Sequence, residues 1–222
     1  MFEAIIFDMD GVVADSEPLH IKAENKTLAP YNVQVTEEDY REFMGRSPKL
    51  LLENLVKKYS INVDMQELLS VHKENLLQLY NNEVTPIEGS LQLIQWFSDR
   101  DYLLALASSS DIKLVDSVIS KFKIRNIFKA VLSGSEVKNI KPAPEIFLKA
   151  ASQLSVQPKH CLVIEDSAAG VKAAQSAGMR CIGFRSPHTP SQDLSLADMV
   201  IDDLTALLTM LKRKGLEDII CF

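Results

Sequence analysis

The sequence predicts an α/β fold in which a parallel sheet is flanked by helices and a block of helices is inserted after the first strand. Three observations support this prediction. A single apolar strand pattern opens the chain at residues 2–6. No strand pattern follows between Asp15 and Asn81. From Pro86 onward, short apolar runs alternate with helical patterns, which indicates a parallel sheet with helices on both faces.

The composition argues against several classes of function. The chain has 222 residues, of which 46% are hydrophobic and 24% charged, as in a globular protein with one large domain or a domain plus an insert. A net charge of −6 gives no electrostatic footprint for nucleic acid or an anionic membrane. No signal-peptide pattern is found, and no apolar run nears the ~18 residues of a membrane span. Cys161, Cys181 and Cys221 are odd in number and lack metal-ligand spacing, so we expect a reducing, cytoplasmic setting.

The inserted block should contain four helices. They are expected to begin at Ser16, Thr36, Ser47 and Asp64, and the first should end near Leu28. Each start combines a capping residue with proline or acidic residues in the first turn, which is the usual signal for a helix N-terminus. The apolar residues that follow recur at helical spacing. The second of these helices would place Tyr40, Phe43 and Met44 inward.

The rest of the chain should build the sheet and its covering helices. The expected elements are a helix at 89–99, a strand at 102–107, a helix at 111–122, strands at 130–132 and 161–164 with a helix at 144–154 between them, a helix at 168–177, strands at 180–184 and 199–201, and a helix at 204–212. The first strand must join this sheet, so the helices between are an insertion. The predicted domains are therefore residues 1–15 with 84–222, and residues 16–83. The apolar tail 219–222 could pack on the core or on a partner.

Two acidic residues follow the first strand directly. Side chains two apart on a strand share a face, so Asp8 and Asp10 should converge where the strand ends. Gly11 then permits a positive φ or the close approach of a ligand. Two carboxylates on one face are costly unless a cation or a reaction uses them. An ordinary turn with solvated aspartates is the alternative at this point.

Further polar residues follow other strands of the predicted sheet. They are Ser108 and Ser109, Lys141, and the pair Glu165-Asp166. Ligands of such sheets bind beyond the carboxyl ends of the strands. Carboxylates of Asp8 and Asp166, with the carbonyl of Asp10, suit Mg²⁺, while Ser108, amides near Ser109 and Lys141 suit a phosphate. Singly, each has an ordinary explanation as a helix cap or a surface lysine; their order along the chain favours a shared site.

The same residues carry a family resemblance that covers the whole chain. The motifs Phe7-Asp8-Met9-Asp10-Gly11, Ser108, Lys141-Pro142 and Glu165-Asp166 resemble the four motifs of the haloacid dehalogenase-like (HAD) hydrolases. The stretches 15–20, 141–147 and 165–170 are similar to the β-phosphoglucomutase-like branch. That branch implies a Rossmann-like core with a helical cap inserted after the first strand, in agreement with the block described above.

The resemblance also implies a mechanism. Asp8 would attack phosphorus and form an aspartyl-phosphate, and Asp10 would act as general acid and then as general base. Asp166 would bind Mg²⁺ directly and Glu165 through water, while Lys141 and Ser108 would hold phosphoryl oxygens. An unperturbed aspartate pKa of about 3.9 would leave the nucleophile ionised at neutral pH.

Substrate choice would depend on the cap, whose polar candidates are His20, Arg46, Lys49 and Lys73. Lys49 and Lys73 are more simply explained as solvated helix residues. His20 is the best candidate, because in this branch a residue at its place lies at the cap hinge and can engage the Asp10 position. The expected partner is a small phosphorylated metabolite, with no nucleic acid or membrane; a monomer is expected and a dimer stays open.

Three functions are compatible with these residues. The first is a Mg²⁺-dependent phosphatase acting on a small metabolite such as a sugar phosphate. The second is a phosphosugar mutase, but mutases of this branch carry a Lys-Asn pair where this chain has Asp111 and Ile112, which are poor phosphate ligands. The third is a non-catalytic phosphate-binding protein, since fold alone does not establish function. Such proteins usually lack the nucleophile or a metal acid, and this chain lacks neither.

Overall fold

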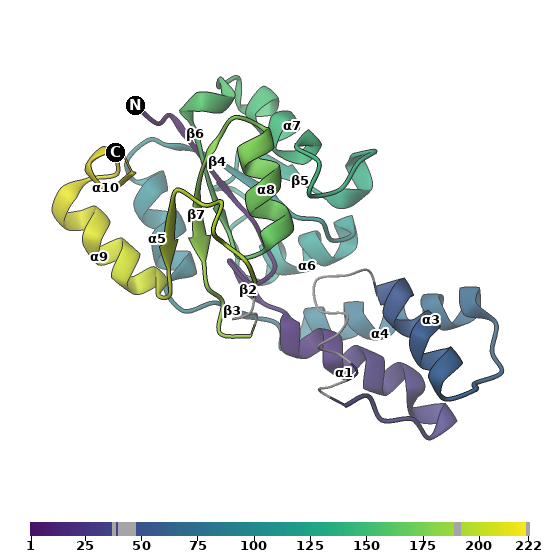
Figure 1. Ribbon diagram of the computed structural model, residues 1–222. Helices are drawn as coiled ribbons and strands as arrows, with labels where there is room; N and C mark the ends of the chain where they lie inside the picture. Colours follow the sequence, from purple (N-terminus) through teal and green to yellow (C-terminus); the bar gives the residue numbers. More distant parts are fainter. Residues whose placement is uncertain (37–38, 40–47, 189–191, 221–222) are drawn as a thin grey trace. The chain divides into compact units, whose positions relative to one another are not determined.

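The computed structural model describes residues 1–36, 39, 48–188 and 192–220 (Figure 1). The chain forms two compact units. The sheet unit comprises Met1–Asp15 and Thr85–Phe222, and the helical unit comprises Ser16–Val84. No helix of the described residues is long and apolar enough to span a bilayer.

A parallel sheet forms the centre of the sheet unit. Over the described residues it has six strands in the order β5-β4-β1-β6-β7-β8, and every neighbouring pair is parallel. The strands are β1 (Ala4–Phe7), β4 (Leu103–Ala107), β5 (Ala130–Leu132), β6 (Cys161–Glu165), β7 (Arg180–Phe184) and β8 (Met199–Ile201). The first strand of the chain thus lies in the middle of the sheet, where its apolar side chains are buried on both faces.

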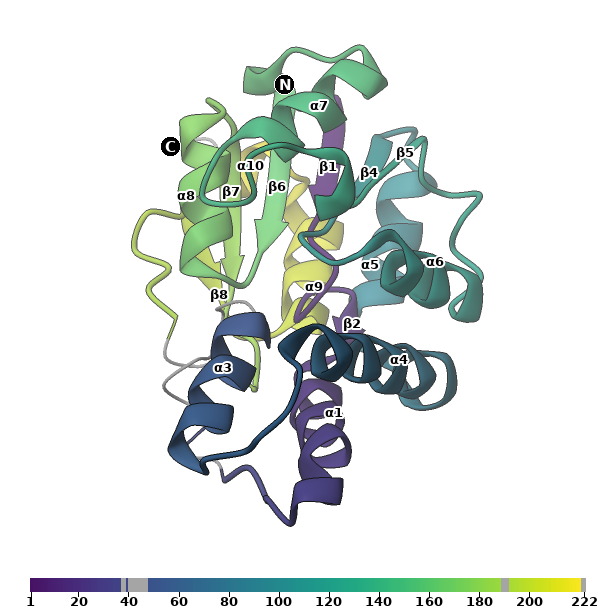
Figure 2. The same cartoon turned by 90° about the vertical axis from the view of Figure 1, so that its right-hand side faces the viewer.

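Helices cover both faces of this sheet, as the sequence predicts. The helices are α5 (Ser90–Ser98), α6 (Ile112–Lys121), α7 (Glu145–Leu154), α8 (Ala168–Ser176), α9 (Leu204–Lys214) and α10 (Glu217–Ile220), with short 3₁₀ turns at Gly134–Glu136 and Pro158–His160. Helices α7 and α8 pack together on one face, and α5 and α9 pack together on the other (Figures 1 and 2). This arrangement follows from the right-handed crossovers that join parallel strands.

Successive side chains of β1 point alternately to the two faces of the sheet, and so to the two layers of helices that cover it. Ala4 and Ile6 belong to the apolar cluster that Phe147 of α7 also joins. The ring of Phe7 points to the opposite layer, where its centroid lies 6.2 Å from that of Phe97 in α5. Because both faces of this strand are packed, its register is strongly fixed, and so is the position of the residues that follow it.

The helical unit contains α1 (Glu17–Leu28), a 3₁₀ turn (Ala29–Tyr31), α3 (Pro48–Lys58) and α4 (Met65–Glu83). Asp64 caps α4 as predicted, since its carboxylate accepts hydrogen bonds from the amides of Gln66 and Glu67. Ser16 precedes α1 but makes no side-chain capping bond; its carbonyl accepts from the amides of the first turn. The helix expected from Thr36 to Met44 falls largely outside the described residues.

A pair of two-residue strands, β2 (Ala14–Asp15) and β3 (Thr85–Pro86), joins the two halves of the sheet unit at the ends of the insertion. The strands are antiparallel, with Ala14 opposite Pro86 and Asp15 opposite Thr85. Neither β2 nor β3 is predicted from the sequence, because two residues are too few to show the alternation of a strand.

The end of the described chain packs on its own sheet unit. Ile219 and Ile220 are 8% and 5% exposed, and α10, which carries them, contacts α9. Cys161 and Cys181 are also buried, as free thiols, and so fill space in the core as small apolar residues.

Candidate active site

The predicted site residues of the sheet unit lie at one edge, directly beyond the paired strands. The amide of Asp8 donates to the carbonyl of Ile164, and the amide of Ser108 donates to the carbonyl of Leu132, each at 2.9–3.0 Å. Both bonds extend the strand ladders by one residue. Asp8 and Ser108 are therefore held by the same backbone pairing that forms the sheet.

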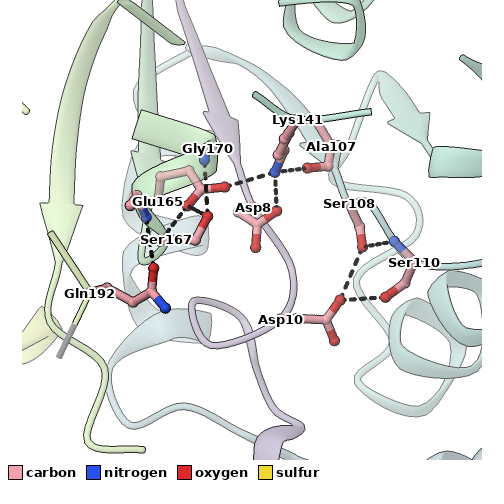
Figure 3. Close-up of polar contacts among 11 residues, drawn as sticks. Asp8, Asp10, Ala107, Ser108, Ser110, Lys141, Glu165, Ser167, Gly170 and Gln192 are labelled. Atoms are coloured by element: carbon pink, nitrogen blue, oxygen red, sulfur yellow. Dashed lines mark hydrogen bonds and ion pairs between the residues drawn. The ribbon is translucent and has the colours of Figure 1, made fainter. Parts of the chain in front are cut away.

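Lys141 brings three strand ends together (Figure 3). Its ammonium contacts Asp8 Oδ1, lies 2.8 Å from Glu165 Oε1, and donates to the carbonyl of Ala107 at 3.1 Å. The ring of Phe147 covers it, with the centroid 4.8 Å from Nζ. The Lys141 side chain is only 5% exposed, so the surface lysine considered from sequence is not what the structure shows.

The charged groups at this edge of the sheet shift the pKa values of one another. Burial alone would lower the pKa of Lys141, but the carboxylates of Asp8 and Glu165 outweigh it and raise that pKa above its usual range, so Lys141 is cationic. Burial also raises the pKa of Asp8 to about 8, with Glu165 and Asp10 acting in the same direction and Lys141 against it. This differs from the unperturbed pKa assumed from sequence, and the chief cause is the burial of Asp8, to which the neighbouring acids add.

Asp10 points toward the serines that follow β4 (Figure 3). Its Oδ2 accepts hydrogen bonds from Ser108 Oγ at 3.1 Å and from Ser110 Oγ at 2.7 Å. Ser108 Oγ in turn accepts from the amide of Ser110 at 3.0 Å. Ser109 is exposed, and its carbonyl packs so closely on Gly134 that a Cβ there would collide with it. The hydroxyl of Ser108, which was predicted to bind phosphate, and that of Ser110 thus orient the Asp10 carboxylate in this structure.

Both oxygens of Glu165 are engaged. Oε1 faces Lys141, while Oε2 accepts from the amide and hydroxyl of Ser167 at 2.7 and 2.9 Å. Gly170 in the first turn of α8 makes room for this carboxylate, because a Cβ at that position would overlap it. The structure places Glu165 between the lysine and the start of α8.

Asp166 lies against the loop that follows β1. A Cβ on Gly11 would collide with the Asp166 carboxylate, and Gly11 has a φ of +78°. Both the close approach and the positive φ favour glycine at this position. The Asp-x-Asp-Gly turn and the motif that follows β6 are thereby brought into contact.

The oxygen donors at this edge suit Mg²⁺. Among the described residues, no group of three or more histidine, cysteine, aspartate or glutamate side chains is arranged to hold a metal ion by itself. The predicted donor set needs no such group, because Mg²⁺ takes one or two carboxylates and keeps several waters. Burial, aided by Glu165 and Asp10, raises the pKa of Asp8, and a divalent cation beside Asp8 and Asp166 would favour the ionised carboxylate.

The predicted cap residues lie in the helical unit. His20 Nε2 is 3.3 Å from the hydroxyl of Tyr80, and the two rings pack edge to face. Lys49 is exposed and pairs with Glu53 one turn along α3, at 3.7 Å. Lys73 is exposed on α4, and Arg46 lies outside the described residues.

Two polar residues of the site were not found from sequence. Ser110 donates the second hydroxyl hydrogen bond to the Asp10 carboxylate. Its place in the run Ser108–Ser110 could have indicated this role. Gln192 accepts a hydrogen bond from the amide of Ala168 at 3.0 Å. No local pattern marks Gln192, because it belongs to a long loop whose path depends on tertiary packing.

Comparison with known proteins places this site in a family context. The family model described as haloacid dehalogenase-like hydrolase matches residues 5–184. The phosphorylated carbohydrates phosphatase of Thermotoga maritima is 31% identical and aligns over 81% of this chain and 83% of its own. The fructose-1-phosphate phosphatase YqaB of Escherichia coli is 28% identical, over 83% of this chain and 97% of its own.

Another relative is much longer than this chain. The chloroplastic protein SUPPRESSOR OF QUENCHING 1 of Arabidopsis thaliana is 34% identical over 82% of this chain, which spans only 18% of that protein.

Solved structures share the fold over nearly the whole length. CbbY of Rhodobacter sphaeroides in complex with phosphate is 28% identical, with a TM-score of 0.81 over 93% of this chain and 96% of that one. β-Phosphoglucomutase of Clostridium difficile is 26% identical, with a TM-score of 0.77 over 99% and 100% of the two chains. The similar proteins therefore include both phosphatases and a mutase.

Proposed function

Since the chain belongs to the haloacid dehalogenase-like hydrolase family, we propose that it hydrolyses a small phosphorylated metabolite, such as a sugar phosphate, through an aspartyl-phosphate on Asp8. Family membership makes the chain a hydrolase, and the named activities of its relatives are those of phosphoric monoester hydrolases. The observation that carries the proposal is the contact of buried Lys141 with both Asp8 and Glu165. It supports a charged centre in which an anionic nucleophile can meet an anionic phosphoryl group.

The reaction would proceed in two displacements. A carboxylate oxygen of Asp8 forms a bond to phosphorus while the ester oxygen leaves, and Asp10 donates a proton to that leaving alkoxide. Asp10 then takes a proton from water, whose oxygen attacks the same phosphorus and releases inorganic phosphate and the Asp8 carboxylate. Lys141 stabilises charge on the phosphoryl oxygens in both steps.

Two features of the described site support these roles. The hydroxyls of Ser108 and Ser110 hold the Asp10 carboxylate, which orients a proton-transfer group without neutralising it. Mg²⁺, if held by Asp8, Asp166 and the carbonyl of Asp10, would supply charge neutralisation at the phosphoryl oxygens. Glu165 would act chiefly on Lys141, because both of its oxygens are engaged.

The mutase remains a second candidate because the C. difficile structure has that name. A mutase must hold a second phosphate, and in this branch that task would fall to the positions of Asp111 and Ile112. The carboxylate of Asp111 caps α6 by accepting from the amide of Lys113 at 3.0 Å, and Ile112 is apolar. An anion and an alkyl chain provide no donors for phosphate, so hydrolysis is favoured.

Substrate selection would belong to the helical unit. His20 stays the first candidate there, because its imidazole is polar and is oriented by Tyr80. Arg46, Lys49 and Lys73 are retained as further candidates, although the ion pair of Lys49 with Glu53 supports an ordinary surface role.

A panel of phosphorylated metabolites, assayed for released phosphate, tests the proposal. We expect release to require Mg²⁺, to stop with a chelator and to return when Mg²⁺ is restored. A purified protein that releases phosphate equally well after chelation would contradict the metal-dependent mechanism.

The mutase is tested with β-glucose 1-phosphate and a trace of the bisphosphate. We expect free phosphate and no accumulation of glucose 6-phosphate. Glucose 6-phosphate appearing without free phosphate would establish the mutase instead.

A further inference from the structure

The long loop between β7 and β8 reaches the metal-side motif of the proposed active site. Gln192 of this loop places its Oε1 3.0 Å from the amide of Ala168, the first residue of α8. Figure 3 shows the Gln192 side chain extended toward this helix start, on the side away from Lys141. Nothing in the phosphatase mechanism above accounts for this contact.

The loop is anchored on both sides of Gln192. Leu194 is 4% exposed and belongs to the apolar cluster of the sheet unit, where Gly183 of β7 leaves it space. On the other side, His188 Nε2 lies 3.3 Å from Asp15 Oδ1 in β2. These ties limit how far the Gln192 side chain can move from its partner.

The contact supplies one of the hydrogen bonds at the start of α8. The first amides of a helix have no partner within it. At α8, Ser167 Oγ accepts from the amide of Gly170, and the amide of Ser167 is bound by Glu165. Gln192 provides the acceptor for Ala168 between them. All three acceptors hold the short turn that carries Asp166.

We propose that Gln192 is a positioning residue for the metal site: by accepting from the Ala168 amide it fixes the Glu165–Ser167 turn, and so the direction of the Asp166 carboxylate. This inference rests on the proposed function, because it assumes that Asp166 binds Mg²⁺. The space available to Asp166 is narrow, since its carboxylate packs on Gly11. A small rotation of the Glu165–Ser167 turn would therefore move the Asp166 carboxylate oxygens away from the cation or into Gly11.

Mg²⁺ binding, measured by isothermal titration calorimetry without substrate, tests the proposal. In Gln192→Met the side chain keeps its length but loses the acceptor. We expect its Mg²⁺ affinity to fall by about tenfold, the lower end for residues that orient a metal ligand. Gln192→Glu keeps an oxygen at the same reach and should retain at least the wild-type affinity. Gln192→Asn has a side chain too short to reach the Ala168 amide, so its Mg²⁺ affinity should fall as in Gln192→Met. It replaces Gln192→Met in the test if that variant does not fold.

Asp193→Ala is the matched control. Asp193 is the exposed neighbour in the same loop, and its carboxylate accepts from the amide of Ser195 at 3.0 Å, so its removal should leave Mg²⁺ binding unchanged. Saturating Mg²⁺ should restore phosphate release by Gln192→Met, because the role proposed for Gln192 is to position the metal ligand Asp166.

The outcomes separate this inference from the proposed function. Wild-type protein that binds no Mg²⁺ overturns both. Wild-type protein that binds Mg²⁺, with Gln192→Met equally tight or Asp193→Ala equally weakened, overturns the role of Gln192 alone.

Discussion

At the scale of single residues, Lys141 and Asp8 each influence the protonation state of the other. Lys141 is buried yet cationic because two carboxylates contact it. Asp8 is buried and its pKa is raised to about 8 chiefly by desolvation, so its ionised form depends on nearby positive charge. If Asp8 is the nucleophile, as we propose, it is active only when its surroundings supply that charge.

Asp8→Asn is expected to abolish turnover while sparing the fold. Asparagine has nearly the same shape but cannot form the aspartyl-phosphate, and Lys141 keeps its bond to Glu165. Loss of a covalent nucleophile should lower kcat by at least ~10³-fold. Released phosphate measures the loss, and circular dichroism checks the fold. Asp99→Asn, at an exposed residue bonded to Gln95, should keep wild-type activity; an active Asp8→Asn enzyme would refute the assignment.

Sequence reasoning identified the residues of the site that carry charge and follow strands. Asp8 follows β1 and Glu165 ends β6, so parallel pairing of these strands brings them to one edge. Lys141 lies in the loop before α7 and reaches the same edge. It did not identify Gln192, because the position of a residue in a long loop depends on contacts distant in sequence. It also misjudged the pKa of Asp8, since burial and neighbouring acids are properties of the folded chain.

At the scale of elements, α8 is the helix most closely fitted to the site. Its N-cap residue, Ser167, donates two hydrogen bonds to the Glu165 carboxylate, and Gly170 lies so close that a Cβ would overlap Oε1. A glycine inside a helix normally costs stability, so its presence here reflects the space that Glu165 needs.

Gly170→Ala is therefore expected to destabilise the protein, although alanine usually stabilises an exposed helix by about 1 kcal/mol relative to glycine. The added methyl group would displace Glu165 from Lys141 and Ser167, so both the thermal midpoint and kcat should fall. Differential scanning calorimetry and phosphate release measure the two effects. Gln175→Ala, at an exposed position of the same helix, should leave both unchanged. A higher midpoint with full activity in Gly170→Ala would show that Glu165 does not need this space.

The elements found from sequence are those with enough residues to show a period. Helix α4 has 19 residues and a capping aspartate, and β5 was predicted at its observed bounds, Ala130–Leu132. The strands β2 and β3 have two residues each, and their pairing is a consequence of tertiary structure. Strand order was likewise not predicted, because every strand of this sheet is apolar and none is marked as central.

At the scale of the whole molecule, buried ionisable groups occur in both units. In the sheet unit, Lys141 contacts Asp8 and Glu165. In the helical unit, Glu24 is 1% exposed and its Oε2 has no hydrogen-bond partner among the described residues. Burial, aided by Glu17, raises the pKa of Glu24 to about 8. Burial of Glu24 should therefore make the stability of the helical unit depend on pH.

The stability of the helical unit is expected to fall as pH rises. Because the pKa of Glu24 is higher in the folded state than its ordinary value, its stabilising contribution is present below about pH 4.5 and is lost as pH rises through about 8. Such a difference corresponds to a few kcal/mol at most, at about 1.4 kcal/mol per pKa unit. Glu24→Gln keeps the size without the charge and should remove most of this dependence.

Thermal melts of both proteins between pH 5 and about 9 measure the effect. The advantage of Glu24→Gln over wild type should grow as pH rises to about 8 and level off above it. Glu74→Gln, at an exposed glutamate of α4, should follow the wild-type curve throughout. Parallel curves for Glu24→Gln and wild type would mean that Glu24 is not protonated in the folded protein.

The paired strands β2 and β3 have a consequence for how such proteins diversify. The chain leaves and re-enters the sheet unit at adjacent, antiparallel positions, so a segment of any length can be accommodated between them without shifting the strands. Asp8, Lys141 and Asp166 are all encoded outside that segment. Evolution can therefore exchange or remodel the inserted module while the proposed reaction centre is inherited intact, and a chimera built at these two junctions should keep its sheet.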